Sequence, residues 1–143
     1  MSDNIWVETP TVDGLNLLHE GCSVAHLGIL ITEVGANFLR GKMPVDARTK
    51  QPFGLLHGGA AALLLETLGS AAANHCVDQQ AHMCVGLEIN CNHVRAAREG
   101  WVFGQASALH IGRTSMIWGL EVRDEQERLV TVGRLTSSVV RRR

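Results

Sequence analysis

One long run of alanine and leucine dominates this sequence: residues 58–75 read GGAAALLLETLGSAAANH. Both residue types have a high helix propensity, and no other segment carries so long a helical signal. Apolar residues occupy every side of the predicted helix, which is typical of a helix enclosed by other elements. Its small residues keep it thin enough for a sheet or a second helix to approach closely. The remainder of the chain must therefore cover this helix.

The segments that follow the helix have the pattern of β-strands. Apolar and polar residues alternate along 101–111, 114–123 and 128–140, and the polar turn DEQE at 124–127 indicates a hairpin between the last two. A fourth strand is predicted at 85–94. Its alternation puts two sets of residues on opposite faces: Val85, Leu87, Ile89, Cys91 and His93 on one, and Gly86, Glu88, Asn90, Asn92 and Val94 on the other.

The part of the chain before the helix adds three shorter elements. A short amphipathic helix is predicted at 12–20, and two strands within 26–45 turn at residues 35–37. No repeat or linker interrupts the chain, so residues 1–143 are expected to form a single domain. One enclosed helix with about four successive strands after it indicates an α+β fold, in which an antiparallel sheet curls around a central helix.

The charge balance excludes several functions. Lys and Arg total 13 against 14 Asp and Glu, a net charge of -1, so no general field attracts nucleic acid or an anionic membrane. The first ten residues, MSDNIWVETP, are acidic and lack the apolar stretch of a signal peptide, and no run is long enough to span a bilayer. A cytoplasmic location is expected. The terminal RRR is interpreted as a solvated tail, with contact to a phosphate as the alternative.

Cysteine and histidine do not indicate a metal site. The four cysteines contain no CxxC pair, which favours reduced thiols acting as small apolar side chains over disulfides or zinc ligands. The seven histidines show no ligand-like spacing. The prediction from these residues is therefore a protein without a metal site.

A single carboxylate, Glu66, interrupts the apolar helix. From Gly58 to Ala73 the polar side chains are Glu66, Thr67 and Ser70, and residues four apart, such as Glu66 and Ser70, share a helix face. A polar patch on a buried helix is unfavourable unless it lines a cavity. This favours a functional carboxylate over the alternative, a glutamate that is exposed at the helix edge or paired with an arginine.

The glycine-rich turn before the helix predicts an anion-binding site. The first backbone N–H groups of a helix have no intrahelical partner, so those of Gly58 and Gly59 can point at an oxygen that carries negative charge. One such donor, placed where charge develops in a transition state, lowers the barrier by about 3 kcal/mol. Gln51 and His57 flank this oxyanion hole and can donate to a carbonyl, although the alternatives are a loop amide and a helix cap.

The separation of the carboxylate from the oxyanion hole predicts a dimer. Glu66 lies eight residues beyond Gly58, which corresponds to roughly 12 Å along a helix axis. A nucleophile or base must lie about 3 Å from the atom on which it acts. Two antiparallel helices related by a two-fold axis would bring each glutamate to the other chain's helix start. A homodimer with two shared sites is therefore expected.

Two sequence blocks carry a resemblance to a known family. MPVDARTKQPFGLLHGGAAALLLETLGS and VGLEINCNHVRAAREG are similar to segments of the hotdog-fold acyl-CoA thioesterases, in the branch of the bacterial dihydroxynaphthoyl-CoA hydrolases and enterobactin-proofreading thioesterases. The likeness extends from AHLGI to RLTSSVV. It implies hydrolysis of a thioester between coenzyme A and an acyl group, often aromatic, without a metal or redox cofactor. It also implies dimers that commonly pair into tetramers.

The resemblance assigns roles to individual residues. Glu66 resembles the catalytic carboxylate, acting as nucleophile or as base for water, and Ser70 resembles a group that helps to place the acyl ring or the glutamate. Gln51 and the Gly58 N–H resemble the groups that polarise the thioester carbonyl, with His57 beside them. Further substrate contacts, most of them around the nucleotide, are implied for Gly86, His93, Val94, Arg95, Ala96, His110, Ile111, Gly112, Arg113, Thr114 and Ser115.

The residue types in the two segments assigned to the nucleotide also support that assignment independently of the resemblance. Arginine and backbone amides suit the phosphates of coenzyme A, although the alternative is a solvated strand end. The chain departs from the family pattern in HIGR, where HLGS is more usual, and in AAANHCVDQQAH. Ala71, Asn74 and His75 lie where acyl-pocket residues are expected, so these departures affect the choice of substrate more than the mechanism.

Two other functions fit parts of the pattern. A hotdog dehydratase also opposes a helical acid to a histidine, but its histidine typically precedes an FP-rich loop, where this chain has HGG. A module that only binds acyl-CoA would keep the arginines and have no need of Glu66. A second strand carboxylate, Glu88, lacks a nearby glycine-rich turn and is interpreted as structural.

Overall fold

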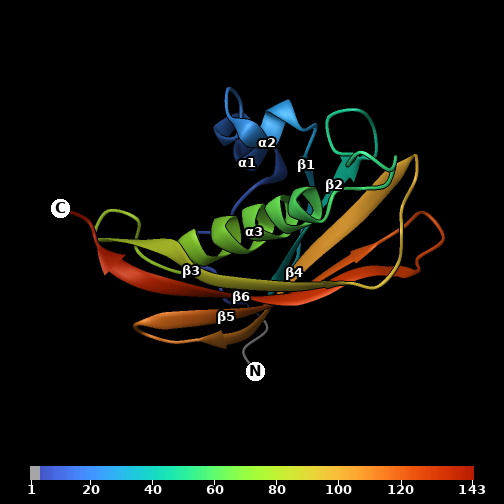
Figure 1. Cartoon of the computed structure of the whole chain (residues 1–143). Coiled ribbons are helices and arrows are strands. Elements are labelled where there is room, and N and C mark those ends of the chain that lie inside the picture. Colours follow the sequence, from blue (N-terminus) through green and yellow to red (C-terminus); the bar gives the residue numbers. More distant parts are fainter. Residues whose placement is uncertain (1–3) are drawn as a thin grey trace.

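The computed structural model describes residues 4–143 and shows a six-stranded antiparallel sheet with one long helix lying across it (Figure 1). Residues 1–3, the start of the acidic N-terminal segment, lie outside the described residues. The strand order is β1-β2-β4-β5-β6-β3. The elements are α1 (Val12–Leu18), α2 (Ser23–His26), β1 (Leu30–Val34), β2 (Phe38–Pro44), α3 (Gly58–Asn74), β3 (His82–His93), β4 (Trp101–Ile111), β5 (Ser115–Arg123) and β6 (Leu129–Arg141).

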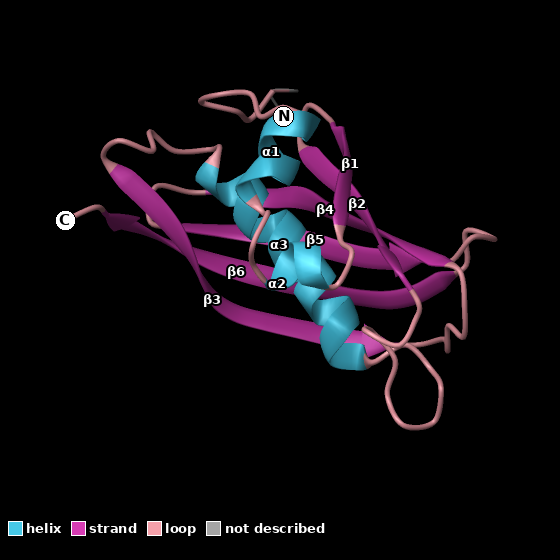
Figure 2. Cartoon of the chain, turned by 90° about the horizontal axis from the view of Figure 1, so that it is seen from above, coloured by secondary structure: helices cyan, strands magenta, loops and turns pink. Residues whose placement is uncertain are grey.

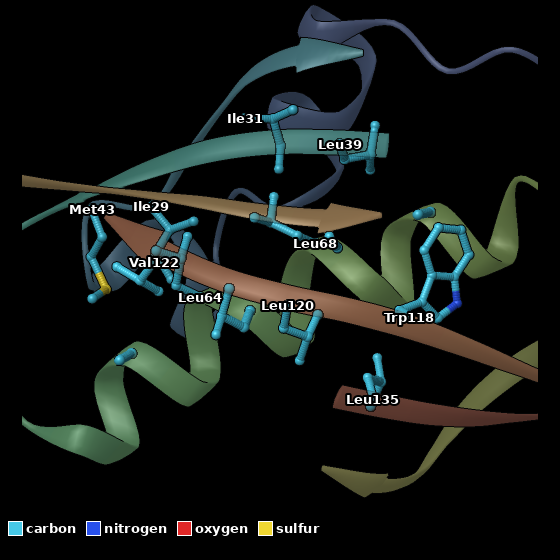
Figure 3. Packing of buried hydrophobic residues seen from close by; sticks show 14 of the residues in the cluster. Ile29, Ile31, Leu39, Met43, Leu64, Leu68, Trp118, Leu120, Val122 and Leu135 are labelled. Carbon is cyan, nitrogen blue, oxygen red and sulfur yellow. The ribbon is translucent and has the colours of Figure 1, made fainter. Parts of the chain in front are cut away.

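The core lies between α3 and the concave face of the sheet (Figure 2). Glycines of the sheet let the helix approach closely, because a Cβ on Gly104 of β4 would lie 3.0 Å from side-chain atoms of both Leu64 and Leu68. Trp118 of β5 and Leu135 of β6 are fully buried beneath the helix (Figure 3). The α+β fold with an antiparallel sheet around a central helix is thus confirmed.

The prediction that α3 is enclosed on all sides is wrong for a single chain. One stripe of the helix packs on the sheet, whereas a second stripe is half-exposed and lines a groove bordered by α1 and α2. A single sheet and a seven-residue helix can cover only part of the circumference of α3. The half-exposed stripe consists of Ala62, Leu63, Glu66, Thr67, Ser70 and Ala71.

The predicted faces of β3 are wrong for its first half because the strand contains a bulge. Gly86 pairs with Ser137 and Glu88 with the adjacent Thr136, so Leu87 is an extra residue without a partner. An extra residue shifts the alternation of faces by one position. Gly86 therefore faces the helix together with Ile89, Cys91 and His93, whereas Val85 and Leu87 are 39% and 70% exposed.

The remaining strand predictions are confirmed. β1 and β2 form the expected N-terminal hairpin, and β5 and β6 are joined at the polar turn, where the Asp124 N–H donates to the Arg128 carbonyl oxygen at 3.0 Å. The short helix α2 was not predicted, because four residues are too few for a periodic signal. None of the helices in the described part of the chain has the length and apolar character needed to span a membrane.

Candidate active site

The start of α3 offers one free backbone donor. His57 is the N-cap of the helix, and its Nδ1 accepts the N–H of Gly59 at 2.8 Å. The predicted pair of free donors is therefore reduced to one, since the Gly58 N–H alone has no partner among residues 4–143. With Nδ1 acting as acceptor, the proton of the neutral His57 ring lies on Nε2, which can donate outward.

The loop before the helix is tightly held and leaves the Gln51 amide free to donate. The backbone N–H of Gln51 donates to the Leu55 carbonyl oxygen at 2.8 Å, and the side-chain oxygen of Gln51 accepts the N–H of Phe53. Gly54 adopts a positive φ of 79° in this turn, which is a conformation that favours glycine. The turn thus uses the oxygen of the Gln51 side chain and leaves its NH₂ group without a hydrogen-bond partner among residues 4–143.

Glu66 lies on the wall of the groove along α3. The groove has a volume of about 670 Å³, and Ser70 lines it as well, as the helix spacing predicted. The Glu66 Oε1 atom lies against Gly86 of β3, where a Cβ would collide with it. No lysine or arginine of residues 4–143 forms an ion pair with Glu66, so the alternative of an arginine-paired glutamate does not describe this structure.

His93 lies beside the start of α3. A Cβ on Gly58 would be 2.7 Å from the Nε2 atom of His93, so the ring and the helix start are in direct contact. The other ring nitrogen, Nδ1, lies 2.9 Å from the hydroxyl of Thr131, which is fully buried. The structure therefore brings His93 together with Gly58, whereas the resemblance had implied a nucleotide contact for it.

The two predicted nucleotide segments lie at opposite ends of the sheet. His93, before the exposed residues 94–96, is opposite Thr131, and Ser115, after the turn at 112–114, is opposite Ser138. Seven residues of β6 separate these positions, which is roughly 23 Å in a strand. One chain therefore cannot join the two segments in a single site. The segments contain Val94, Arg95 and Ala96 at one end and His110, Ile111, Gly112, Arg113, Thr114 and Ser115 at the other.

A family model described as thioesterase superfamily matches residues 53–131. This range runs from the loop before α3 through α3, β3, β4 and β5 to the start of β6. The chain belongs to the thioesterase superfamily.

Relatives of this thioesterase match along nearly the whole chain. The 1,4-dihydroxy-2-naphthoyl-CoA hydrolase of Escherichia coli strain K12 is 46% identical over 136 residues, covering 95% of this chain and 99% of that protein. The proofreading thioesterase EntH of Cronobacter sakazakii is 44% identical over 136 residues, covering 95% and 98%. A crystal structure of a variant of the thioesterase PA1618 from Pseudomonas aeruginosa has a TM-score of 0.95 at 41% identity, covering 97% of this chain and 100% of that one. The expected hotdog thioesterase family is confirmed, and the chain is a thioester hydrolase.

Several groove residues of this thioesterase escaped the sequence interpretation. Residues of α1 and α2 form one side of the groove, and Arg142 lies at its end. No local pattern marks them, because they reach the groove only through the tertiary fold. Thr131, whose hydroxyl contacts His93, likewise has no sequence feature that distinguishes it from other strand residues. These additional lining residues are Leu15, Leu18, His19, Ser23, Val24, Gln79 and Arg142.

The remaining polar candidates of the thioesterase have structural explanations. Glu88 accepts a hydrogen bond from the Asn90 side-chain amide at 3.1 Å on the outer side of β3. All four cysteines are free thiols, and burial, followed by the effect of Cys84, raises the pKa of Cys76 to about 12. Within residues 4–143, no group of three or more His, Cys, Asp or Glu side chains is arranged to hold a metal ion.

Proposed function

We propose that this thioesterase hydrolyses acyl-CoA thioesters to a free acid and coenzyme A, with Glu66 as the catalytic carboxylate. The placement of Glu66 carries the proposal: it lines the groove without an ion-pair partner among residues 4–143, on the helix whose start presents the free N–H of Gly58. A relative named as a naphthoyl-CoA hydrolase supports coenzyme A as the thiol part of the substrate.

The active unit in this proposal is a dimer that pairs two β3 strands. β3 is the last strand of the sheet and pairs with β6 on one side, which leaves the backbone of its other edge available. An open edge of 12 residues is a template for pairing with another chain. Val85 and Leu87 are exposed on this strand, so a second copy would remove apolar surface from water.

An antiparallel β3 pair would join the groups that one chain keeps apart. Gly58 contacts the His93 end of β3, whereas Glu66 contacts Gly86, nearer the other end. In an antiparallel pair, the His93 end of one strand lies beside the Gly86 end of the other. Each glutamate would then approach the helix start of the other chain. The same symmetry would bring Arg113 of one copy toward Arg95 of the other, and both arginines are exposed and suited to the phosphates of coenzyme A.

The proposed mechanism uses these groups in fixed roles. The Gly58 N–H and the Gln51 side-chain amide donate to the thioester carbonyl oxygen and stabilise its developing negative charge, with the His57 Nε2–H beside them. Glu66 either bonds to the carbonyl carbon or removes a proton from a water molecule whose oxygen forms that bond. In both routes the carbon–sulfur bond breaks and the departing thiolate takes up a proton. Direct attack leaves an acyl-enzyme anhydride, which water then hydrolyses.

An aromatic acyl group is proposed as the preferred class. The relative named for a dihydroxynaphthoyl thioester supports this class. The groove also has a volume of about 670 Å³ and small side chains at Ala62 and Ala71, which leave room for a ring beside Ser70. Pairing of dimers into tetramers stays a prediction.

Release of free thiol tests the proposed function. Purified protein is assayed with benzoyl-, phenylacetyl-, dihydroxynaphthoyl- and straight-chain acyl-CoA. Glu66→Gln, which keeps the shape and removes the charge, is expected to lower kcat by about 10²–10⁴-fold. Glu88→Gln is the matched control, because it removes an exposed carboxylate from β3 and is expected to leave kcat unchanged.

The competing functions give different results in this assay. A change in enoyl absorbance from a mixture of hydroxyacyl and enoyl thioesters, without thiol release, would identify a dehydratase. Binding of acyl-CoA without turnover, unaffected by Glu66→Gln, would identify a binding module. Either result contradicts the proposed hydrolysis.

A further inference from the structure

The groove continues past Glu66 toward the C-terminal end of α3, and its far end carries a positive charge. Asn74, His75, Gln79 and Arg142 line this end, and Asn74 lies about 12 Å along the helix from Glu66. Arg142 follows β6, and the C-terminus lies beside the loop that joins α3 to β3 (Figure 1). Glu66 is the only carboxylate among the described residues that line the groove.

Two polar neighbours of Arg142 are already engaged in the groove wall. The Asn74 side-chain amide donates to one backbone carbonyl on α3 and one on β3, at 2.9 and 3.0 Å, and its oxygen accepts the Cys84 N–H at 2.9 Å. The Nδ1 atom of His75 lies 3.0 Å from the Glu8 carbonyl oxygen. Arg142 is therefore the charged donor at this end of the groove.

The Arg142 side chain is held in place but keeps free donors. Its backbone N–H donates to the Ala81 carbonyl oxygen at 3.0 Å, and its Nε donates to the His82 carbonyl oxygen at 3.2 Å. The four ion pairs of residues 4–143 involve other arginines. The terminal guanidinium nitrogens thus have no protein partner in the described chain. Their planar arrangement matches the two oxygens of a carboxylate.

We propose that Arg142 binds a carboxylate at the end of the acyl group that is remote from the thioester. Among CoA thioesters with the same acyl frame, aromatic or aliphatic, those whose acyl group ends in a second carboxylate are then preferred. This inference rests on the proposed function, because the thioester is placed at Glu66. Arg142 is exposed, so a carboxylate beside it keeps part of its hydration and gains charge-assisted hydrogen bonds from the guanidinium. An alkyl end gains no such bonds.

The test compares two acyl groups that differ in the terminal carboxylate alone, octanoyl-CoA and the monothioester octanedioyl-CoA. The unmodified protein is expected to hydrolyse octanedioyl-CoA with the higher kcat/KM. Arg142→Ala is expected to lower that kcat/KM by about tenfold or more, the loss of one charge-assisted contact, with less than about a twofold change for octanoyl-CoA. Arg142→Lys keeps the charge without the fork and is expected to retain part of the preference.

The neighbouring arginine provides a matched control. Arg141 ends β6, pairs with His82 and does not line the groove, so Arg141→Ala removes the same charge from the same region. It is expected to leave both substrates unchanged. Equal kcat/KM for the two substrates in the unmodified protein contradicts the proposal. An Arg141→Ala effect as large as that of Arg142→Ala also contradicts it, because it indicates a general effect of charge on coenzyme A binding.

A binding experiment decides the same question without turnover. The probes are two thioethers that cannot be hydrolysed, S-octyl-CoA and S-(7-carboxyheptyl)-CoA. Tighter binding of the carboxylated thioether, lost in Arg142→Ala, supports the proposal, and equal binding of the two thioethers overturns it. Failure to hydrolyse any acyl-CoA would overturn the proposed function instead, and the binding comparison would still decide the role of Arg142.

Discussion

Gly58 combines two requirements at the start of α3. It must leave space for the His93 ring, whose Nε2 would lie 2.7 Å from a Cβ at this position, and in the proposed mechanism its N–H donates to the substrate. His93 cannot easily withdraw, because its Nδ1 contacts the buried Thr131 at 2.9 Å. A similar contact occurs at Gly86, where the missing side chain makes room for the Glu66 carboxylate. Both ends of the candidate site thus depend on a missing methyl group.

Substitution of Gly58 by alanine tests this arrangement. The added methyl group collides with His93, so Gly58→Ala is expected to lower the free energy of unfolding by about 1–3 kcal/mol. Displacement of the helix start is also expected to lower kcat by about tenfold or more, since a misplaced donor stabilises the oxyanion less well. Urea denaturation and a thiol-release assay measure the two effects.

A double-mutant cycle supplies the control for Gly58. His93→Ala removes the ring that the new methyl group would meet. The combined variant is therefore expected to be more stable than the sum of the two single effects predicts. Strict additivity of the two unfolding free energies would show that the close contact with His93 is not the source of the destabilisation.

Among the elements, β3 and α3 define the site together. The bulge at Leu87 turns Gly86 toward the helix. In a regular strand of the same sequence, Leu87 would instead lie opposite Ser137, and its side chain would occupy the space of the Glu66 carboxylate. On the other side, glycines of β2 and β4 let α3 sit close to the sheet, which leaves the polar stripe of the helix pointing into the groove.

The close approach of β4 to α3 leads to a prediction on stability. A Cβ on Gly104 would lie 3.0 Å from atoms of Leu64 and Leu68, both fully buried. Gly104→Ala is therefore expected to lower the free energy of unfolding by about 1–3 kcal/mol through overpacking. Gly119→Ala is the control on the neighbouring strand, because its Cβ would meet Leu109 at 3.4 Å, an ordinary contact. Equal urea midpoints for the two variants would contradict the proposed overpacking.

At the scale of the whole molecule, the proposed catalytic unit is a dimer, because one chain keeps apart the groups that are proposed to act together. The carboxylate and the free N–H lie on the same helix, roughly 12 Å apart along its axis. The two predicted nucleotide segments lie at opposite ends of the sheet. A two-fold axis at the edge of β3 would close both gaps at once. We propose a dimer with shared sites mainly because a single two-fold axis would bring both pairs of separated groups together.

Hybrid dimers test the shared site. Gln51→Ala and Glu66→Ala are each expected to abolish most activity. When equal amounts are mixed and exchange subunits, half of the dimers contain one chain of each kind, and each such dimer has one intact site. The mixture is then expected to regain about a quarter of the unmodified activity. If native mass spectrometry confirms exchange and thiol release stays at background, the carboxylate and the amide do not act across the interface.

The sequence by itself was sufficient to predict the fold and to single out Glu66 and the HGG turn as the candidate site. The apolar run of α3 and the period-two strands reflect local propensity and burial, which depend on residues near in the chain. The lone Glu66 and the HGG turn stand out for the same reason. The resemblance then connected these residues to thioester hydrolysis, and the comparisons confirmed the family.

Only the tertiary structure decided which residues meet. Strand register decides that Gly86 faces α3. Side-chain packing decides that His93 contacts Gly58 and that the His57 ring accepts the N–H of Gly59. Arg142 reads as part of a terminal run, yet the pairing of β6 with β3 places it at the end of the groove. Such contacts join positions far apart in the chain, and no local pattern encodes them.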